Sequence, residues 1–296
     1  MLSNRIFIAA ISLCILIPGL SSCRRDNSVT PADVKEDLKQ RTVVFKVSGS
    51  DFEVKATSSG FENGDVIGLF APDMDKFNVK GTVQGTALNP ETPIRWESGQ
   101  TASSGFCAYY PYIEDLDQST VSFKVQADQT GAEAYAQSDL RASYVYAAPR
   151  TTVNFVLKHC FSKLALNFTS KVSGETVTSV ALKDLVTDAV VDLATSAPAK
   201  GTEKADISAF KQSEGSFCAI LIPQPFLNVE VTTSKDRKVT FSTYIPVEME
   251  SGCAYKADLV LPELNHETTE LEFTVSLDDW TDGGAVPYGD SKQEGL

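Results

Sequence analysis

The stretch that decides the fold is residues 151–169, TTVNFVLKHCFSKLALNFT, near the middle of the chain. It holds two runs in which apolar side chains occupy every second position: Val153, Phe155 and Leu157, then Leu164, Leu166 and Phe168. A period of two with β-branched and aromatic residues predicts strands rather than a helix. A polar loop, residues 128–150, precedes the stretch, and a second series of alternating runs follows it. We therefore expect the stretch to begin the second of two similar β domains.

Alternating runs of the same kind continue through the rest of the chain. In residues 121–127, Val, Phe, Val and Ala alternate with Ser, Lys and Gln. Residues 66–71 are apolar throughout, which predicts a central strand covered on both faces. Such runs, separated by turn residues, are typical of β-sandwiches and barrels. No stretch after residue 41 has the period of a helix, so the fold class that we predict is all-β.

Composition limits the number of domains and the kinds of partner. The chain has 296 residues, of which 42% are hydrophobic, and at ~150 residues per domain this predicts two domains. Lys and Arg number 26 against 39 Asp and Glu, a net charge of −13. Nucleic-acid binding needs a basic face, and no Lys/Arg cluster of that kind occurs, so no nucleic-acid partner is expected. With only two histidines, His159 and His266, we expect neither a metal nor a cofactor.

The N-terminus has the pattern of an export signal. Arg5 is followed by residues 6–17, which are apolar except for Ser12, and then by Pro18-Gly19, as in secretory signal peptides. The next residues, Leu20-Ser21-Ser22-Cys23, resemble a bacterial lipobox, in which the cysteine is lipidated and becomes the first residue of the mature chain. Acyl chains on Cys23, palmitate among them, would anchor the protein stably to the outer membrane. An ordinary signal peptide with a chance cysteine is the alternative.

The sequence thus divides into four predicted parts: a lipoprotein signal peptide (residues 1–22), a tether (23–41), an N-terminal β domain (42–150) and a C-terminal β domain (151–296). Within the tether, Thr30 before Pro31 predicts an N-cap and a helix start. Residues 31–40 are then a short charged helix or an unstructured spacer that holds the fold away from the membrane.

Four cysteines remain in the mature chain after Cys23: Cys107, Cys160, Cys218 and Cys253. An even set in an oxidising compartment permits a disulfide. Two of them, however, lie in the apolar contexts Phe106-Cys107-Ala108 and Phe217-Cys218-Ala219, which favours buried free thiols that act as small hydrophobes. The chain contains no CxxC motif, so a zinc or redox site has no support.

Two groups of residues raise the question of catalysis or metal binding. His159 precedes Cys160, but side chains at adjacent strand positions point to opposite faces, which argues against a Cys-His dyad. We expect His159 to be a structural residue, hydrogen-bonded in a turn or a domain interface. Asp73, Asp75 and Asn78 have a spacing that hints at calcium, but the glycine and distal glutamate of a calcium loop are missing. We expect a solvated turn.

A third group combines carboxylates with aromatic residues. Asp278, Asp279 and Asp282 flank Trp280 near the C-terminus, an arrangement also found in glycoside hydrolases. Surface loops commonly carry such clusters, and we predict no enzyme. The side chains of Tyr144, Tyr146 and Tyr288 could stack on sugar if they are exposed; packing at a sheet edge is the alternative.

Several motifs in order resemble the fimbrillin family of Bacteroidales lipoproteins, which includes pilus stalk, tip and anchor subunits. They cover nearly the whole mature chain: the lipobox, residues 61–71 (FENGDVIGLFA), residues 106–112 (FCAYYPY), Ser138-Asp139-Leu140, Phe155 with His159 and Ser162-Lys163-Leu164, and residues 277–283 (LDDWTDG). The resemblance implies two tandem transthyretin-like Greek-key β-sandwich domains. It also implies a structural or adhesive subunit of cell-surface fimbriae, of the type V pilus kind, that assembles with other subunits by strand exchange.

The resemblance further implies that an Arg-specific protease cuts near the first strand and frees a groove for a donor strand from the next subunit. The candidate processing residues are Arg41 and Lys55, the latter at a position where the family often has arginine. The tail, residues 282–296, contains Gly, Asp and Pro and makes a poor donor strand, which favours an accessory, tip or anchor subunit. Partners would be other fimbrial subunits, the outer membrane through the lipid, and a host or bacterial surface receptor. The alternative function is a lipid-anchored, glycan-binding surface module.

Overall fold

The computed structural model describes residues 41–49, 61–263, 270–272 and 275–278, together with Thr30, Ala32, Val34 and Lys35. The chain forms two compact units, residues 1–39 and residues 40–296. In the first unit, the amide of Val34 donates to the Thr30 carbonyl at 3.1 Å, one turn of the helix predicted there. The predicted signal peptide and Cys23 lie outside the described residues.

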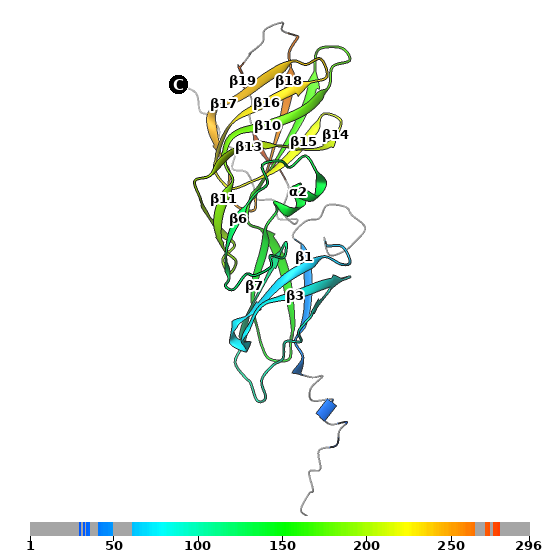
Figure 1. The fold of residues 1–296 in the computed structure, drawn as a ribbon, viewed down its shortest axis with the longest axis vertical. Helices are drawn as coiled ribbons and strands as arrows, with labels where there is room; N and C mark the ends of the chain where they lie inside the picture. The colour runs from blue at the N-terminus through cyan, green and yellow to red at the C-terminus, as the bar shows by residue number, and fades with distance from the viewer. Residues whose placement is uncertain are drawn as a thin grey trace, which may run out of the picture. The chain divides into compact units, whose positions relative to one another are not determined.

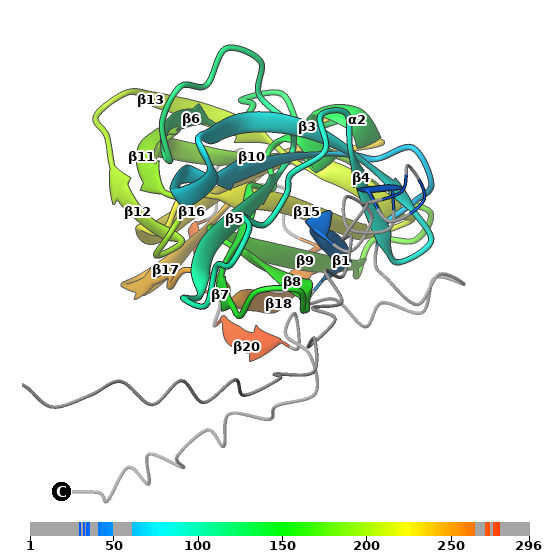
Figure 2. The ribbon, with the colours of Figure 1, turned by 90° about the horizontal axis from the view of Figure 1, so that it is seen from below.

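The described part of the second unit is built almost entirely of strands, as predicted (Figure 1). Seven strands form a closed barrel in the order β1-β4-β3-β2-β5-β7-β8. Their bounds are β1 (Val44–Gly49), β2 (Val66–Ala71), β3 (Lys76–Gln84), β4 (Ala87–Pro90), β5 (Ser104–Tyr110), β7 (Arg141–Ala147) and β8 (Thr152–His159). We expected a sandwich here. The sheet closes because β1 pairs with β4 on one side and, in parallel, with β8 on the other (Figure 2).

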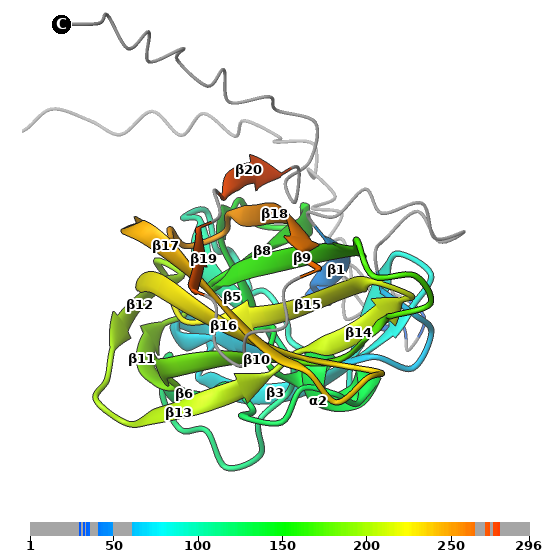
Figure 3. The same cartoon turned by 90° about the horizontal axis from the view of Figure 1, so that it is seen from above.

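Two five-stranded sheets follow along the chain. The first has the order β13-β10-β16-β17-β19 and the second the order β14-β15-β9-β18-β20 (Figure 3). Phe168 on β9 and Phe241 on β17 bring their ring centroids to 6.1 Å, so the two sheets pack face to face. The first sheet's strands are β10 (Val177–Val186), β13 (Lys204–Ser208), β16 (Pro225–Thr233), β17 (Lys238–Glu248) and β19 (Glu270–Glu272). The second sheet's strands are β9 (Ser162–Ser170), β14 (Phe210–Ser213), β15 (Ser216–Leu221), β18 (Ala254–Leu261) and β20 (Ser276–Asp278).

A smaller sheet links the two halves of the chain. It has the order β12-β11-β6, with β6 (Thr120–Lys124), β11 (Asp188–Asp192) and β12 (Ala197–Lys200). β6 comes from the first half, yet it pairs antiparallel with β11 over five residues. This pairing joins the hydrogen-bond networks of the two halves, and on its other side β11 pairs antiparallel with β12.

Residues 151–169 form the two strands predicted for them, β8 and β9. Buried and exposed residues alternate along β8, and buried and half-buried residues along most of β9. Val153, Phe155 and Leu157 lie in the barrel core, whereas Leu164 and Leu166 lie in a second core between the later sheets. The change from one core to the other therefore falls between β8 and β9. The division into domains at residue 150 stays a prediction.

The second core also includes side chains from the outside of the barrel. Phe70 on β2, and Cys107 and Tyr109 on β5, are buried there. The thiol of Cys107 donates to the Leu193 carbonyl at 3.6 Å. Strand β2 is therefore covered on both faces, as its continuous apolar run predicts.

Two short helical segments lie in the connections. They are a 3-10 turn, η1 (Pro72–Met74), and α2 (Ala132–Gln137). We did not predict α2, because six residues are too few to show a helical period. Within the described residues, no helix has the length and hydrophobicity needed to cross a membrane.

Candidate functional site

The first strand of the barrel, β1, is the described element that bears on the predicted assembly by strand exchange. Val43, Phe45 and Val47 are 2–3% exposed and point into the barrel core. Phe45 stacks on Phe155 of β8 at a centroid distance of 5.9 Å and meets Phe106 of β5 edge-on at 5.6 Å. Strand β1 therefore fills a row of alternate apolar sites, which is how a donor strand is held in strand-exchange systems.

The backbone of β1 is bonded along both edges. Its parallel register with β8 runs from Val44↔Thr152 to Gly49↔Leu157. On the other side it pairs with β4, and two further bonds extend this edge: Val43 N to the Ile94 carbonyl at 2.9 Å and Val47 N to the Thr86 carbonyl at 3.0 Å. Removal of β1 would leave unpaired backbone groups on both neighbouring strands as well as an open apolar groove.

Of the two candidate processing residues, the structure describes Arg41 only. Its carbonyl accepts a hydrogen bond from Trp96 N at 2.7 Å, and its Nη2 donates to Ser98 Oγ at 2.7 Å. The adjacent Thr42 forms an antiparallel bridge with Arg95. A protease binds its substrate as an extended strand, so cleavage at Arg41 would require these bonds to open. Lys55 lies outside the described residues, in the connection between β1 and β2.

His159 takes part in a buried ionic cluster at the end of β8. Its Nδ1 lies 2.6 Å from Asp139 Oδ1, and the guanidinium of Arg141 donates to Asp139 Oδ2 at 2.7 Å. Arg141 and His159 hold the pKa of Asp139 well below its usual range despite its burial. Sequence reasoning missed the role of Asp139, because no local signal links residues 20 positions apart.

Among the cysteines that the structure describes, Cys107 and Cys160 are buried free thiols, Cys253 is a half-buried one, and Cys218 is buried. Burial raises the pKa of Cys107 and of Cys160 to about 12, with Asp192 adding to the effect at Cys107 and Asp139 at Cys160. A thiol with such a pKa is protonated at neutral pH, whereas the thiolate is the nucleophilic form. Cys160 also belongs to the second core, whereas His159 contacts Asp139.

The residues of the calcium-like spacing serve different parts of the structure. Asp73 accepts the Gly105 amide at 2.9 Å. Asn78 donates to the Ile113 carbonyl at 3.0 Å and accepts the Tyr109 hydroxyl at 2.6 Å. Asp73 and Asp75 are exposed, as expected of a solvated turn. Within the part of the chain that the structure describes, no group of three or more His, Cys, Asp or Glu side chains could hold a metal ion.

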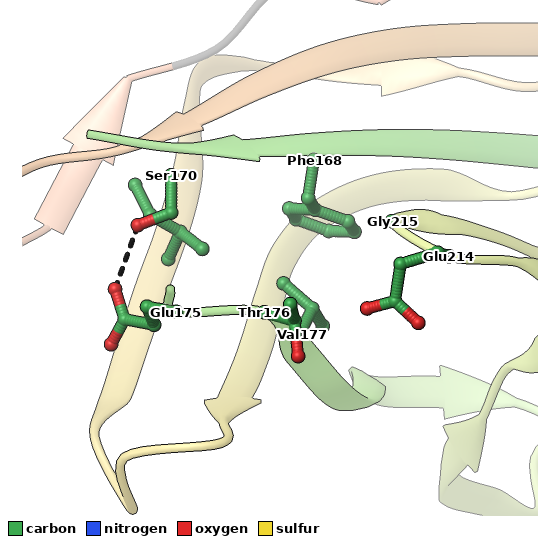
Figure 4. Close-up of a pocket in the computed structure, with 8 residues that line it drawn as sticks. Phe168, Ser170, Glu175, Thr176, Val177, Glu214 and Gly215 are labelled. Atoms are coloured by element: carbon green, nitrogen blue, oxygen red, sulfur yellow. Dashed lines mark hydrogen bonds between the residues drawn. The ribbon is translucent and has the colours of Figure 1, made fainter. Parts of the chain in front are cut away.

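A small cavity of about 110 Å³ lies between the two packed sheets (Figure 4). Phe168, Val177 and Leu261 form its apolar lining, and Glu214 stands beside them. The second carboxylate, Glu175, is committed to Arg237 at 2.6 Å, Ser170 at 2.7 Å and Thr233 at 2.8 Å. Ligand pockets usually enclose ~300–1,000 Å³, so this cavity is small, and the role of Glu175 is to join the ends of β9 and β16.

The aromatic and acidic residues singled out near the C-terminus are only partly described. The backbone of Asp278 pairs with Ala254 at the end of β20. Asp279, Trp280, Asp282, Tyr288 and His266 lie outside the described residues. Tyr144 and Tyr146, by contrast, lie within the described residues. Both are on the outside of β7, and both are exposed.

The described residues form an all-β fold with two apolar cores, and the first strand of the barrel is paired on both edges. The chain belongs to the fimbrillin-like family, whose model matches residues 55–280. This match confirms the family prediction. No curated protein sequence matches the chain.

Solved structures share the fold at low sequence identity. A candidate cell adhesion protein from Bacteroides ovatus has a TM-score of 0.65 and 16% identity, with 82% of this chain and 97% of that chain covered. A candidate cell adhesion protein from Bacteroides uniformis has a TM-score of 0.64 and 18% identity, with 82% and 100% covered. At such identities the likeness supports the fold.

Proposed function

We propose that this chain is a structural or adhesive subunit of cell-surface fimbriae of the type V kind, exported as a lipoprotein through Cys23 and assembled by strand exchange. Its membership of the fimbrillin-like family supports the fimbrial role. For the two predicted domains of this chain, residues 42–150 and 151–296, we propose the tandem transthyretin-like arrangement, in which β1 closes the first domain. The role is structural rather than enzymatic.

The observation that carries the assembly proposal is the double pairing of β1. Strand β1 supplies Phe45 and Val47 to the core, with Val43 just before it, and forms hydrogen bonds with two strands. A cut between β1 and β2, for which Lys55 is the candidate, would detach β1 from the rest of the fold. A cut after Arg41 would release the tether and leave β1 attached. Only the first cut opens a groove for a partner's strand.

The proposed position in the fimbrium is accessory, at the tip or the base. Lys55 stands where an Arg-specific protease would need arginine, and residues 282–296 make a poor donor strand. A subunit that makes only one of the two strand-exchange contacts, because the other is inefficient, would end a polymer rather than extend it. N-terminal sequencing of the surface-extracted protein checks this: a start at residue 56, with long homopolymers of this chain, would overturn the accessory role.

Strand exchange is tested by a designed cut. A site for a sequence-specific protease replaces part of residues 50–60, and the cut protein is mixed with a fluorescent peptide of residues 42–49, TVVFKVSG. We expect the peptide to displace the cut strand and to co-migrate with the protein.

The matched control places the same site within residues 31–40, where cutting leaves β1 attached. A second control is the peptide with Phe45→Asp, which cannot enter the apolar row. Equal uptake by both cut proteins, or equal uptake of both peptides, would rule out exchange at β1.

A further inference from the structure

Two tyrosines form an exposed aromatic pair on the outside of β7. Tyr146 is 71% exposed and Tyr144 is 37% exposed. Their ring centroids lie 5.2 Å apart with an interplanar angle of 78°. In this edge-to-face arrangement one ring supports the other and leaves an aromatic face open to solvent. Apolar surface of this kind on a folded chain calls for an explanation when it is clustered.

The neighbouring strand makes room for the pair with a glycine. Gly105 of β5 lies opposite Tyr146 in the antiparallel register. A Cβ on Gly105 would lie 2.9 Å from Tyr144 Cζ, closer still to its hydroxyl oxygen, and 3.5 Å from Tyr146 Cε1. The two rings therefore rest over bare backbone, and any side chain at residue 105 would displace Tyr144.

A carboxylate lies beside the rings. Oδ2 of Asp73 accepts the Gly105 amide at 2.9 Å, which fixes the side chain next to the tyrosines. Its other oxygen has no hydrogen-bond partner among the residues that the structure describes. A hydrogen bond with Tyr146, burial and the nearby Asp73 raise the pKa of Tyr144 to about 12. The phenol is protonated at neutral pH, and its hydrogen bond with Tyr146 couples the two hydroxyl groups.

We propose that Tyr144, Tyr146 and Asp73 form a binding site for a pyranose ring of a neutral glycan. An exposed aromatic face attracts the weakly positive C–H groups of a sugar ring, because the face of the ring carries the negative part of its quadrupole. The free oxygen of Asp73 accepts a sugar hydroxyl, and the phenol groups can donate or accept. This inference does not depend on strand exchange.

Charge and size select this ligand class. The chain carries a net charge of −13, and Asp73 adds a local negative charge, so uronic and sialic acids are repelled. A stable protein partner takes about 800 Å² from each side, far more than two side chains supply. A single sugar ring matches the size of the pair.

The test is affinity electrophoresis of the full-length protein in native gels cast with soluble polysaccharides. The neutral probes are a mixed-linkage β-glucan, a galactomannan and an arabinoxylan, and the acidic probe is polygalacturonate. We expect retardation by at least one neutral polysaccharide and none by polygalacturonate. Loss of a stacked ring in Tyr146→Ala should weaken the apparent affinity by about tenfold or more, whereas Tyr146→Phe retains the ring and should stay within about threefold of the wild type.

Gly105→Ala is the sharper variant, because it displaces Tyr144 while every ligand-contacting atom remains in the chain. We expect a loss similar to that of Tyr146→Ala. Val260→Ala, which trims an exposed residue of β18 (48% exposed), is the matched control and should bind as the wild type does.

Three results would overturn the proposal. They are the absence of retardation in all three neutral gels, unchanged binding in both Tyr146→Ala and Gly105→Ala, and a tyrosine-dependent retardation by polygalacturonate alone. Gel filtration of the same variants covers the remaining alternative: a change of oligomeric state in Tyr146→Ala without a change in retardation would make the pair a contact between protein chains.

Discussion

Nδ1 of His159 lies 2.6 Å from Oδ1 of Asp139, and both side chains are almost completely buried where β8 ends. Arg141 binds the other oxygen of the same carboxylate at 2.7 Å. Asp139 thus holds the guanidinium of Arg141 from β7 and the imidazole of His159 from β8. The three side chains meet where the chain leaves the barrel for the second core. The cluster accounts for the Ser138-Asp139-Leu140 and Phe155-to-His159 motifs in structural rather than catalytic terms.

Asp139→Asn is expected to destabilise the fold by about 3–5 kcal/mol, because it removes the buried carboxylate that neutralises the largely buried guanidinium of Arg141. The unfolding free energy from urea titration measures the loss. Asp206→Asn is the control: its ion pair with Lys183 is on the surface, and such pairs contribute roughly 0–1 kcal/mol. Similar losses in the two variants would show that the Asp139 cluster is not a buried ionic centre.

Acid sensitivity should follow Glu175. Hydrogen bonds from Arg237, Ser170 and Thr233 lower its pKa from 4.5 to about 2. A carboxyl whose pKa is lower in the folded state stabilises that state above the unfolded pKa, and the contribution is lost as pH falls through the folded pKa. We therefore expect the urea midpoint to fall between pH 4.5 and pH 2.

The control for this pH dependence is Glu175→Gln, which should be less stable at pH 7 and should lose less stability over the same acid range. Asp139 also contributes in this range, since its pKa is lowered too, so the slope should shrink without vanishing. An unchanged slope in Glu175→Gln would contradict the assignment.

The two faces of a strand should respond differently to a carboxylate. Leu166→Asp on β9 and Phe123→Asp on β6 are each expected to prevent folding, because a buried unpaired carboxylate costs several kcal/mol, about the stability of a whole domain. Ser122→Asp, on the exposed face of β6, should be mild. Circular dichroism and soluble yield distinguish the variants.

The control on β9 has to avoid the neighbouring carboxylate of Asp258. Asn167→Asp, which the alternation alone predicts to be mild, would place a second carboxylate next to Asp258, since Asn167 Nδ2 donates to Asp258 Oδ1 at 2.9 Å. Thr169→Asp is the better control, because Thr169 is exposed. Equal damage from Leu166→Asp and Thr169→Asp would mean that the register of β9 is wrong.

Gly68→Ala should destabilise the barrel by about 1–3 kcal/mol through overpacking. A Cβ at residue 68 would lie 2.7 Å from the Tyr109 hydroxyl oxygen and closer still to two ring carbons. Tyr109 is fully buried and bonded to Asn78 and Ile113, so it cannot move aside. Gly131→Ala, with open space around the new Cβ, is the control. Differential scanning calorimetry would show a lower Tm for Gly68→Ala only, and an unchanged Tm would contradict the contact.

The sequence by itself determined the strand class and which residues face inward. Alternation in β8 and β9, and the continuous apolar run of β2, matched the burial observed along each strand. The reason is local: successive side chains of a strand point to opposite faces, so burial of one face is written directly into residue order. The ordered motifs likewise identified the fimbrillin-like family.

Only the tertiary structure decided how the strands pair and which distant side chains meet. β1 closes the barrel against β8, more than 100 positions away, β6 pairs with β11, and Asp139 meets His159. Pairing of this kind depends on which surfaces pack together and satisfies backbone groups that are the same in every residue, so no residue pattern encodes it. The tyrosine pair over Gly105 is a further case. The sequence shows that residue 105 is a glycine, but only the register of β5 with β7 places two tyrosines over it.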